Sequence, residues 1–357
     1  MEKRILLAFL LSSIIFIGWQ KIFPTTHQRP QAETIQVIEN KQVIEKTDAV
    51  DAARFSVDDV GPVKASREEE RVVLNNGKIE VELTTRGGVI DRARILGFDA
   101  VLPVTDVLKM PAFADLDYQI ESRGRNQVVF TAKSRAIEIR KKFILSDDDF
   151  LVSADTQVRN AGREALVFDS KVTAMALDMT MMDDAIEKSR DRNLLEYSVF
   201  SQDKVIRKTS AFKFTSKENK AITAPVDWFG FRDRYFCAIV NPEIPVSGYE
   251  IVSRNSDGKQ LGLYAVLGEG PLAAGETFSF QATIYVGPQN ARILKKYEAS
   301  FEKIQVYFKM AFMDAIAKII EDLMILMHKL VRNWGVAIIL VSLLIYFAMY
   351  PLTMKSM

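Results

Sequence analysis

The chain of 357 residues contains one cysteine, Cys237, and two histidines, His27 and His328. A single cysteine excludes an intramolecular disulfide. Cys237 lies within the apolar run Tyr235–Ile239, so we interpret it as a core residue in preference to a catalytic thiol. Because neither histidine lies in the middle of the chain, we expect no zinc site and no histidine-activated nucleophile there.

The formal net charge is only +1 and no basic block occurs, which argues against a nucleic-acid partner. No phosphate-binding glycine loop and no nucleophile-elbow motif is present. The acidic pairs Asp183-Asp184 and Glu321-Asp322 are read as solvated charges, and Met179–Met182 as a loop or core patch. We therefore predict no catalytic residue, no metal site, no cofactor and no enzymatic activity.

Two long apolar segments are present. Ile5–Phe23 follows Lys3 and Arg4 and lacks a small-residue cleavage site, so we interpret residues 1–24 as an uncleaved anchor in preference to a signal peptide. Val336–Ala348 has no charged residue, and with its flanks it approaches the roughly 20 apolar residues that a membrane crossing needs. Since basic residues favour the cytoplasmic side, we expect a cytoplasmic amino terminus and an outward-facing middle region.

The residues between the two apolar segments change character at residue 71. Residues 25–70 are rich in acidic residues and have few aromatic ones, which is typical of a mobile linker, with a short helix as the alternative over Thr34–Lys46. Residues 71–290 show period-two alternation, clearest over Ile79–Thr84 and Phe278–Val286. Further strands are expected over Val128–Thr131, Ala136–Leu145, Leu151–Val158 and Tyr235–Val240. Because no long helices alternate with these strands, we predict a mainly β, antiparallel sandwich.

Residues 291–332 are predicted to be a helical connector. It ends in an amphipathic helix with Ile316, Ile319 and Leu330 on the apolar face and Asp314 and Lys318 on the polar face. We favour a position in the membrane interface over packing on the β domain. Residues 333–357 are predicted to form the second membrane span.

Several segments carry a resemblance. They are Leu83–Ile90, Lys141-Lys142-Phe143, Val158-Arg159-Asn160, Val226–Phe236, Gly275, Tyr285–Pro288, Asn333-Trp334-Gly335 and Met349–Thr353. In this order, with these two apolar segments, they resemble the YidC insertases, the Gram-negative form of the Oxa-type family. The positions that match family motifs are Gly87, Gly88, Trp228, Tyr235, Phe236, Gly287, Pro288, Asn333, Trp334, Gly335, Tyr350 and Pro351.

The resemblance implies a multi-pass protein of the bacterial inner membrane with a periplasmic β-supersandwich. Its activity would be that of an insertase and chaperone, which inserts nascent inner-membrane proteins and helps them to fold through a hydrophilic groove. Expected partners are nascent membrane proteins, the Sec translocon, the lipid bilayer and, through regions that this sequence lacks, the ribosome. Because the family's membrane core has four further spans, we expect the chain to be truncated after the second span.

The family usually carries an arginine in the span that begins with Asn-Trp-Gly, where it faces the groove. An ungapped match places Tyr346 at this position. Ser342, Tyr346 and Thr353 fall on roughly one side of the helix, and we interpret that side as groove-facing. In the alternative, Ser342 bonds to its own helix and Tyr346 anchors in the interface or packs on another helix.

Two other functions remain open. The chain could be a membrane-anchored periplasmic binding subunit, whose β-sandwich takes a protein, peptide or carbohydrate. Family sandwiches resemble sugar mutarotases, but mutarotase chemistry typically uses histidine, which this domain lacks. The chain could also be an accessory subunit that acts only with a partner.

Overall fold

The computed structural model describes residues 53–54, 68–167, 171–181, 195–209, 220–254, 260–267, 270–305 and 311–356. The expected first span, nearly all of the expected linker and the Asp183-Asp184 pair lie outside these residues. The chain divides into two compact units. One covers Val50–Gln305, and the other contains α4 (Ala311–Val331) and α5 (Trp334–Ser356).

The first unit is mainly β. Its strands are β1 (Ala53–Arg54), β2 (Arg71–Asn75), β3 (Ile79–Thr84), β4 (Val89–Ile95), β5 (Ala100–Leu102), β6 (Val104–Thr105), β7 (Gln119–Arg123), β8 (Gln127–Lys133), β9 (Ile137–Leu145), β10 (Leu151–Asn160), β11 (Leu166–Val167), β12 (Lys171–Asp178), β13 (Glu196–Ser201), β14 (Lys204–Thr209), β15 (Lys220–Ile222), β16 (Trp228–Arg232), β17 (Phe236–Pro242), β18 (Gly248–Ser253), β19 (Gln260–Val266) and β20 (Thr277–Pro288). Its short helices are η2 (Leu96–Phe98), η3 (Pro111–Phe113), η4 (Met179–Met181), α3 (Ala291–Leu294) and η8 (Phe301–Ile304).

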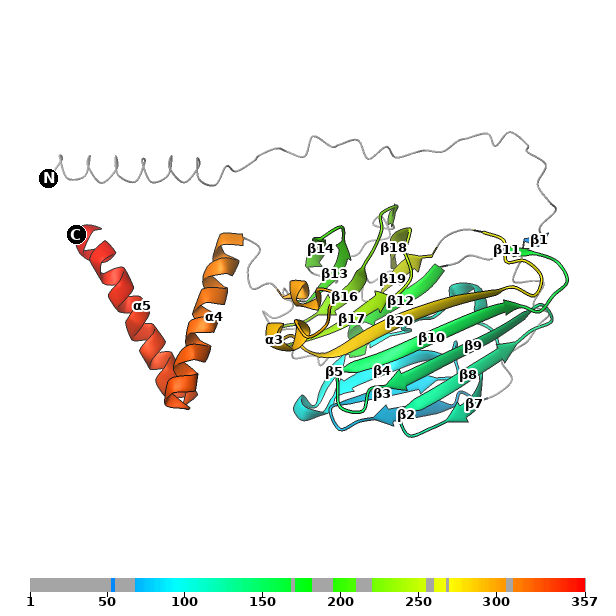
Figure 1. Ribbon diagram of the computed structural model, residues 1–357, viewed down its shortest axis with the longest axis horizontal. Helices are drawn as coiled ribbons and strands as arrows, with labels where there is room; N and C mark the ends of the chain where they lie inside the picture. The colour runs from blue at the N-terminus through cyan, green and yellow to red at the C-terminus, as the bar shows by residue number, and fades with distance from the viewer. Residues whose placement is uncertain are drawn as a thin grey trace, which may run out of the picture. The chain divides into compact units, whose positions relative to one another are not determined.

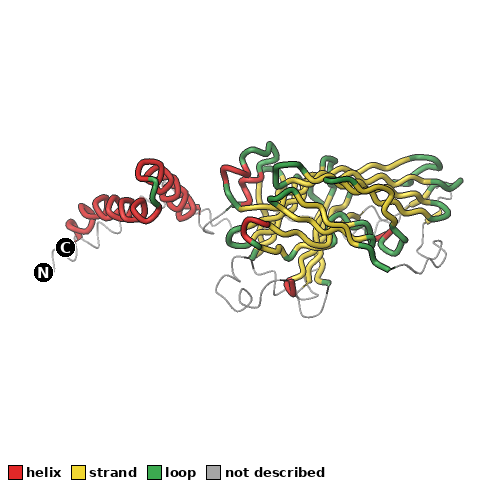
Figure 2. Tube along the Cα trace, turned by 90° about the horizontal axis from the view of Figure 1, so that it is seen from below, coloured by secondary structure: helices red, strands yellow, loops and turns green. Residues whose placement is uncertain are grey.

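Three antiparallel sheets enclose the main core (Figures 1 and 2). The nine-stranded sheet has the order β14-β13-β16-β17-β20-β10-β9-β8-β7. The five-stranded sheet has the order β15-β18-β19-β12-β6, and the four-stranded sheet the order β2-β3-β4-β5. β1 and β11 form a separate short parallel pair. The prediction of a mainly β, antiparallel domain is confirmed.

Alternating side chains explain why these segments form strands. In β9 every second residue, from Ile137 to Leu145, is buried. The same pattern holds for β10 and most of β3. A strand of this kind buries one face and leaves the other to solvent, as a sandwich requires. The expected strands over Ile79–Thr84 and Phe278–Val286 are confirmed as β3 and as part of β20.

A second, smaller core fixes the end of this unit onto the nine-stranded sheet. Leu294, Phe301 and Ile304, from α3 and η8, pack with Trp228 and Tyr285. Cys237 belongs to the same core and is fully buried, which confirms the prediction that it is a core residue. The chain from Ala291 to Gln305 is therefore an integral part of the β unit.

Buried charge reinforces this attachment. Glu196 of β13 accepts a hydrogen bond from Nε of Arg232 (3.1 Å) and forms an ion pair with Arg207 (3.5 Å). Arg207 in turn donates to the backbone carbonyls of Lys303 and Ile304. Because Glu196 is only 3% exposed, its negative charge needs a partner inside the protein, and both arginines compensate it. We call Arg207, Glu196 and Arg232 the arginine clamp.

In the second unit, α4 and α5 form a helical hairpin (Figure 1). Arg332 adopts a left-handed conformation (φ 52°), and its N–H donates to the carbonyl of His328 (2.7 Å), which ends α4. The Asn333 side chain then accepts a hydrogen bond from the N–H of Val336 (3.3 Å).

The helix expected before residue 332 is present as α4, but one residue differs from the expected pattern. Asp314, expected on the polar face, is 9% exposed. It pairs with Lys318 one turn away (2.9 Å). Ile319 and Leu330, on the expected apolar face, are exposed. In the part of the chain that the structure describes, no helix combines the length and the apolar character that a membrane crossing requires.

The arginine clamp generates the first prediction. In Arg207→Met, Glu196 should stay paired with Arg232, but the Lys303 and Ile304 carbonyls should lose their hydrogen-bond donor. This loss should lower the free energy of unfolding by about 1–2 kcal/mol. Amide hydrogen exchange in η8 should accelerate. The matched control is Lys204→Met, on the same strand but exposed. Equal acceleration in both variants would contradict the clamp.

Candidate functional site

Gly87 and Gly88 form a tight turn between β3 and β4, with φ of 89° and 59°. A Cβ added to Gly88 would lie 2.8 Å from Cδ1 of Tyr118. Only glycine allows both the left-handed backbone and this close approach. This family-motif pair therefore has a packing role in the structure.

Lys141 of β9 binds this turn from inside the protein. The side chain is fully buried, and Nζ donates to the carbonyls of Gly87 (2.9 Å) and Leu108 (3.0 Å). Burial, assisted by the charge of Lys109, lowers the pKa of Lys141 from 10.5 to about 7, while Asp106 acts in the opposite direction. A buried amine whose charged form is disfavoured stays in place through its hydrogen bonds.

The Lys141 bonds bring all three sheets together. Gly87 follows β3 of the four-stranded sheet, and Lys141 belongs to the nine-stranded sheet. Leu108 N–H donates to the carbonyl of Thr173 (2.8 Å), in β12 of the five-stranded sheet. The amine of Lys141 therefore connects the loops at the junction of the three sheets.

An ion network lies beside this junction. Asp106 pairs with Lys109 (3.3 Å) and with Arg254 (2.6 Å). Burial by itself would raise the pKa of Asp106, but the hydrogen bond from Arg254 and the two positive charges outweigh it, so the pKa is lowered. These contacts join the loop after β6 to the end of β18.

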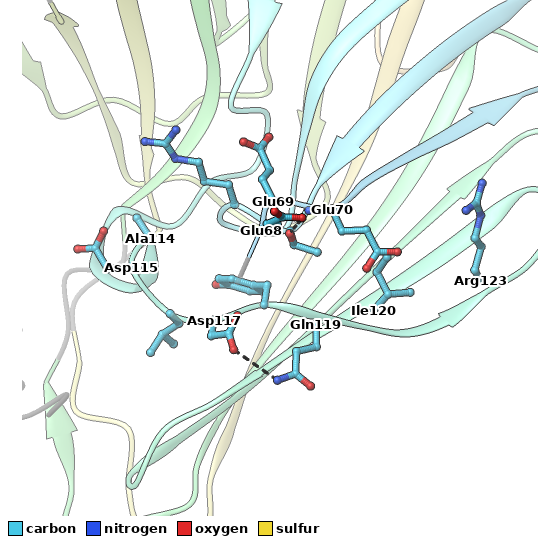
Figure 3. Close-up of a pocket in the computed structure, with 13 residues that line it drawn as sticks. Glu68, Glu69, Glu70, Ala114, Asp115, Asp117, Gln119, Ile120 and Arg123 are labelled. Atoms are coloured by element: carbon cyan, nitrogen blue, oxygen red, sulfur yellow. Dashed lines mark hydrogen bonds between the residues drawn. The ribbon is translucent and has the colours of Figure 1, made fainter. Parts of the chain in front are cut away.

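A cleft of about 940 Å³ opens between the start of β2 and the segment that leads into β7 (Figure 3). Its lining residues are Glu68, Glu69, Glu70, Thr85, Arg86, Ala114, Asp115, Leu116, Asp117, Tyr118, Gln119, Ile120 and Arg123. Tyr118 belongs both to this lining and to the surroundings of Lys141, whose Nζ lies 5.2 Å from the ring centre. We call it the β7 cleft. Among the described residues, no three histidine, cysteine or acidic side chains are grouped so as to hold a metal ion.

Of the aromatic residues at family-motif positions in the β unit, Trp228 and Phe236 have packing roles and Tyr235 does not. Trp228 is fully buried and stacks on Phe200, with ring centres 5.2 Å apart. Phe236 contacts the ring of Phe98 at 5.2 Å. Tyr235, by contrast, is 64% exposed.

Gly287 and Pro288 pack around Tyr285. A Cβ on Gly287 would lie 2.7 Å from the Tyr285 hydroxyl. That hydroxyl donates to the carbonyl of Pro288 (2.8 Å). Burial raises the pKa of Tyr285, so the phenol stays protonated and able to donate.

The Asn333-Trp334-Gly335 motif forms the turn of the hairpin. Asn333 caps α5, and Trp334 stacks on His328 with ring centres 3.9 Å apart. A Cβ on Gly335 would lie 3.3 Å from Oδ1 of Asn333. Tyr350 is exposed, and Pro351 lies within α5, with its side chain outside the described part.

The candidate groove-facing residues lie on α5. Ser342 Oγ donates to the carbonyl of Ile338 (2.8 Å), so this hydroxyl bonds to its own helix. Tyr346 is 64% exposed. The Thr353 side chain lies outside the described part. The buried side of α5 carries Ala337 and Val341, about 180° and 140° around the helix from Tyr346.

Sequence reasoning did not interpret Lys141 or the arginine clamp. A signal for Lys141 was present, because it occupies the inward register of β9, between Ile139 and Phe143. Glu196 and Arg232 gave no comparable signal, since their pairing depends on strands β13 and β16 becoming neighbours.

Comparison with known proteins gives consistent matches. The model of the YidC periplasmic domain family matches residues 111–319. A protein of Treponema denticola named membrane protein insertase YidC is 21% identical, over 100% of this chain and 69% of that protein. A protein of the same name from Anaeromyxobacter sp. (strain K) is 28% identical, with the same coverage of both chains. A galactose mutarotase-like protein from Lactobacillus casei aligns with 11% identity and a TM-score of 0.46, over 61% of this chain and 100% of that chain.

The glycine turn generates the second prediction. Gly88→Ala should destabilise the β unit by about 2–4 kcal/mol, from left-handed strain plus the contact with Tyr118. Gly77→Ala is the matched control, because Gly77 also has positive φ (86°) but no atom within 4 Å of the added Cβ. It should cost only about 1–2 kcal/mol. Urea unfolding followed by tryptophan fluorescence measures both, and equal losses would rule out the Tyr118 contact.

Lys141 generates the third prediction. Its pKa is about 7 in the fold and 10.5 in a free lysine side chain, so above pH 7 the unfolded chain binds more protons than the folded chain. The lysine therefore adds to stability as pH rises from about 7 towards 10.5, by up to about 1.4 kcal/mol per pH unit. Lys141→Met should remove this slope.

The matched control is Lys142→Met, the outward-facing neighbour on β9. Its unfolding free energy should follow the wild-type pH dependence between pH 7 and pH 10. If Lys141→Met kept the wild-type slope of unfolding free energy against pH, the buried amine of Lys141 would not be neutral in the fold.

Proposed function

The chain belongs to the YidC family, and from this membership we propose that it inserts nascent proteins into the bacterial inner membrane and helps them to fold. The observation that carries the proposal is the family match over residues 111–319, joined to a helical hairpin with an exposed apolar surface. The proposed partners are nascent membrane proteins and the Sec translocon. The ribosome is another proposed partner.

The exposed surface of the hairpin supports a membrane location. Its exposed large apolar side chains are Phe312, Met313, Ile316, Ile319, Leu326, Leu330, Trp334, Val336, Ile338, Ile339, Leu343, Leu344, Ile345, Tyr346, Phe347, Met349, Tyr350 and Met354. A soluble monomer rarely exposes a continuous apolar surface of this kind. Lipid is the solvent in which such a surface is stable.

We assign the second membrane crossing to α5 with its flanking residues. The uncharged apolar stretch Val336–Ala348 lies within this helix, and only with its flanking residues does it approach the roughly 20 residues that a crossing needs. α4 is proposed to lie in the outer interface. The amino terminus is proposed to be cytoplasmic and the β unit periplasmic.

Insertion needs a polar path through lipid, because unsatisfied polar groups there cost several kcal/mol each. We propose that Ser342, Tyr346 and Thr353 line this path. Tyr346 lies opposite the buried side of α5, where further helices could face it. A phenol can donate a hydrogen bond to a passing segment but carries no positive charge.

A binding role for the β unit is the second candidate function. It is favoured by the β7 cleft, whose volume of about 940 Å³ is at the upper end of the roughly 300–1,000 Å³ typical of ligand sites. This role is compatible with insertion, since the cleft and the Tyr346 side of α5 belong to different units.

The test of insertion, and the fourth prediction, is depletion of the protein in its own bacterium. Newly made small inner-membrane proteins should fail to become protease-protected, and the full-length wild-type gene should restore protection. Rescue with Tyr346→Arg should raise insertion several-fold for substrates with acidic translocated segments, because the added charge attracts them.

The control for charge is Tyr346→Gln, which is polar but neutral and should leave the preference for acidic segments unchanged. Normal insertion after depletion would refute the proposed function. An equal response to Tyr346→Arg and Tyr346→Gln would instead refute the groove position of this residue.

A further inference from the structure

The nine-stranded sheet ends in an open backbone edge. β7 is its last strand, and it pairs only with β8 among the described strands. Four of its five residues are exposed. Open edges present unpaired N–H and C=O groups, which another extended chain can use.

The β7 cleft lies along the amino-terminal half of this edge. Gln119 and Ile120 of β7 line it, and just before β7 begins the backbones of Arg86 and Asp117 form an isolated antiparallel β-bridge. In Figure 3, Glu68, Glu69 and Glu70 lie across from the segment that carries Asp117 and Gln119. The open edge therefore faces a space with a defined opposite wall.

The charge of the cleft is mainly negative. Five carboxylates line it (Glu68, Glu69, Glu70, Asp115 and Asp117), against two guanidinium groups (Arg86 and Arg123). Glu69 is already paired with Arg71 (2.8 Å), and Asp117 accepts a hydrogen bond from Gln119 (3.4 Å).

Three of these acids are available for a ligand. The side chains of Glu68, Glu70 and Asp115 have no hydrogen-bond or ion-pair partner within the described residues. Their charges would attract a cation across several ångströms of water, since screening at physiological salt acts over about 8 Å.

The inner wall is apolar and includes one unused polar atom. Leu116 and Tyr118 are almost fully buried. The Tyr118 hydroxyl has no hydrogen-bond partner in the described part of the protein. Burial raises its pKa, so it stays a neutral donor. The hydroxyl has almost no solvent-accessible surface, so the inner wall presents an essentially apolar surface to the cleft.

We propose that the β7 cleft binds an extended, positively charged polypeptide segment of a partner protein. The segment adds a strand to the edge at Gln119 and Ile120, and its lysine or arginine side chains meet Glu68, Glu70 and Asp115. The register shift between Ile120 and Ser122 limits the paired stretch to this amino-terminal half of β7. This inference does not depend on the insertase function.

The fifth prediction uses a fluorescent decapeptide of alternating lysine and threonine. Its binding to the full chain in lipid nanodiscs is measured by anisotropy, beside a peptide with glutamate in place of lysine. The lysine peptide should bind and the glutamate peptide should not. The double variant Glu70→Lys/Asp115→Lys should weaken binding by at least about tenfold, which is about 1.4 kcal/mol.

The matched control is a second acidic cleft, which includes Asp227 and Glu298. Asp227→Lys/Glu298→Lys makes the same change of charge there and should leave the affinity unchanged. An equal loss in both double variants would show attraction by net charge alone and would overturn the proposal.

Strand addition has its own test. The lysine peptide with its four central amides N-methylated keeps its charge but cannot donate to a sheet edge. It should bind at least about tenfold more weakly. Amide exchange in β7 should slow with the unmethylated peptide only. Equal binding of the two peptides, or binding of the glutamate peptide, would overturn the proposal.

Discussion

The need to cover apolar surface governs this protein. Burying apolar surface contributes about 25 cal/mol per Å², and the β unit achieves this by itself through two cores that contain most of its described large apolar side chains. The α4–α5 hairpin does not, since most of its large apolar side chains remain exposed. The proposed membrane location of the hairpin rests on this difference between the two units.

Inside the β unit, the buried amine of Lys141 is costly in free energy, because burial disfavours its charged form. Lys141 could be replaced by an apolar residue of similar length, but then the carbonyls of Gly87 and Leu108 would be unsatisfied. These two carbonyls hold the loops where three sheets meet, and Tyr118 beside them forms part of the β7 cleft wall. The junction therefore shapes the cleft, while the arginine clamp attaches the opposite end of the unit, at η8.

Local pattern was enough to predict the mainly β class and strands such as β3 and β20, because alternation is a property of neighbouring residues. Sheet order was beyond such reasoning. β10 pairs with β20, more than a hundred residues away, and this choice depends on the whole core. The β7 cleft could not be predicted for the same reason, since it needs Glu68 and Ile120 to meet. The low exposure of Asp314 could not be predicted, because helical periodicity assigns a residue to a face and does not give its burial.

The central proposal is that α5 has a water-facing side at Tyr346 and a lipid-facing side about 100° away at Phe347, which is also exposed. The most direct measurement is labelling of Tyr346→Cys and Phe347→Cys in native membranes with a charged maleimide. Cys237 gives no background, because it is fully buried and burial raises its pKa. The account predicts fast labelling at position 346 and none at position 347. Equal rates at the two positions would contradict it.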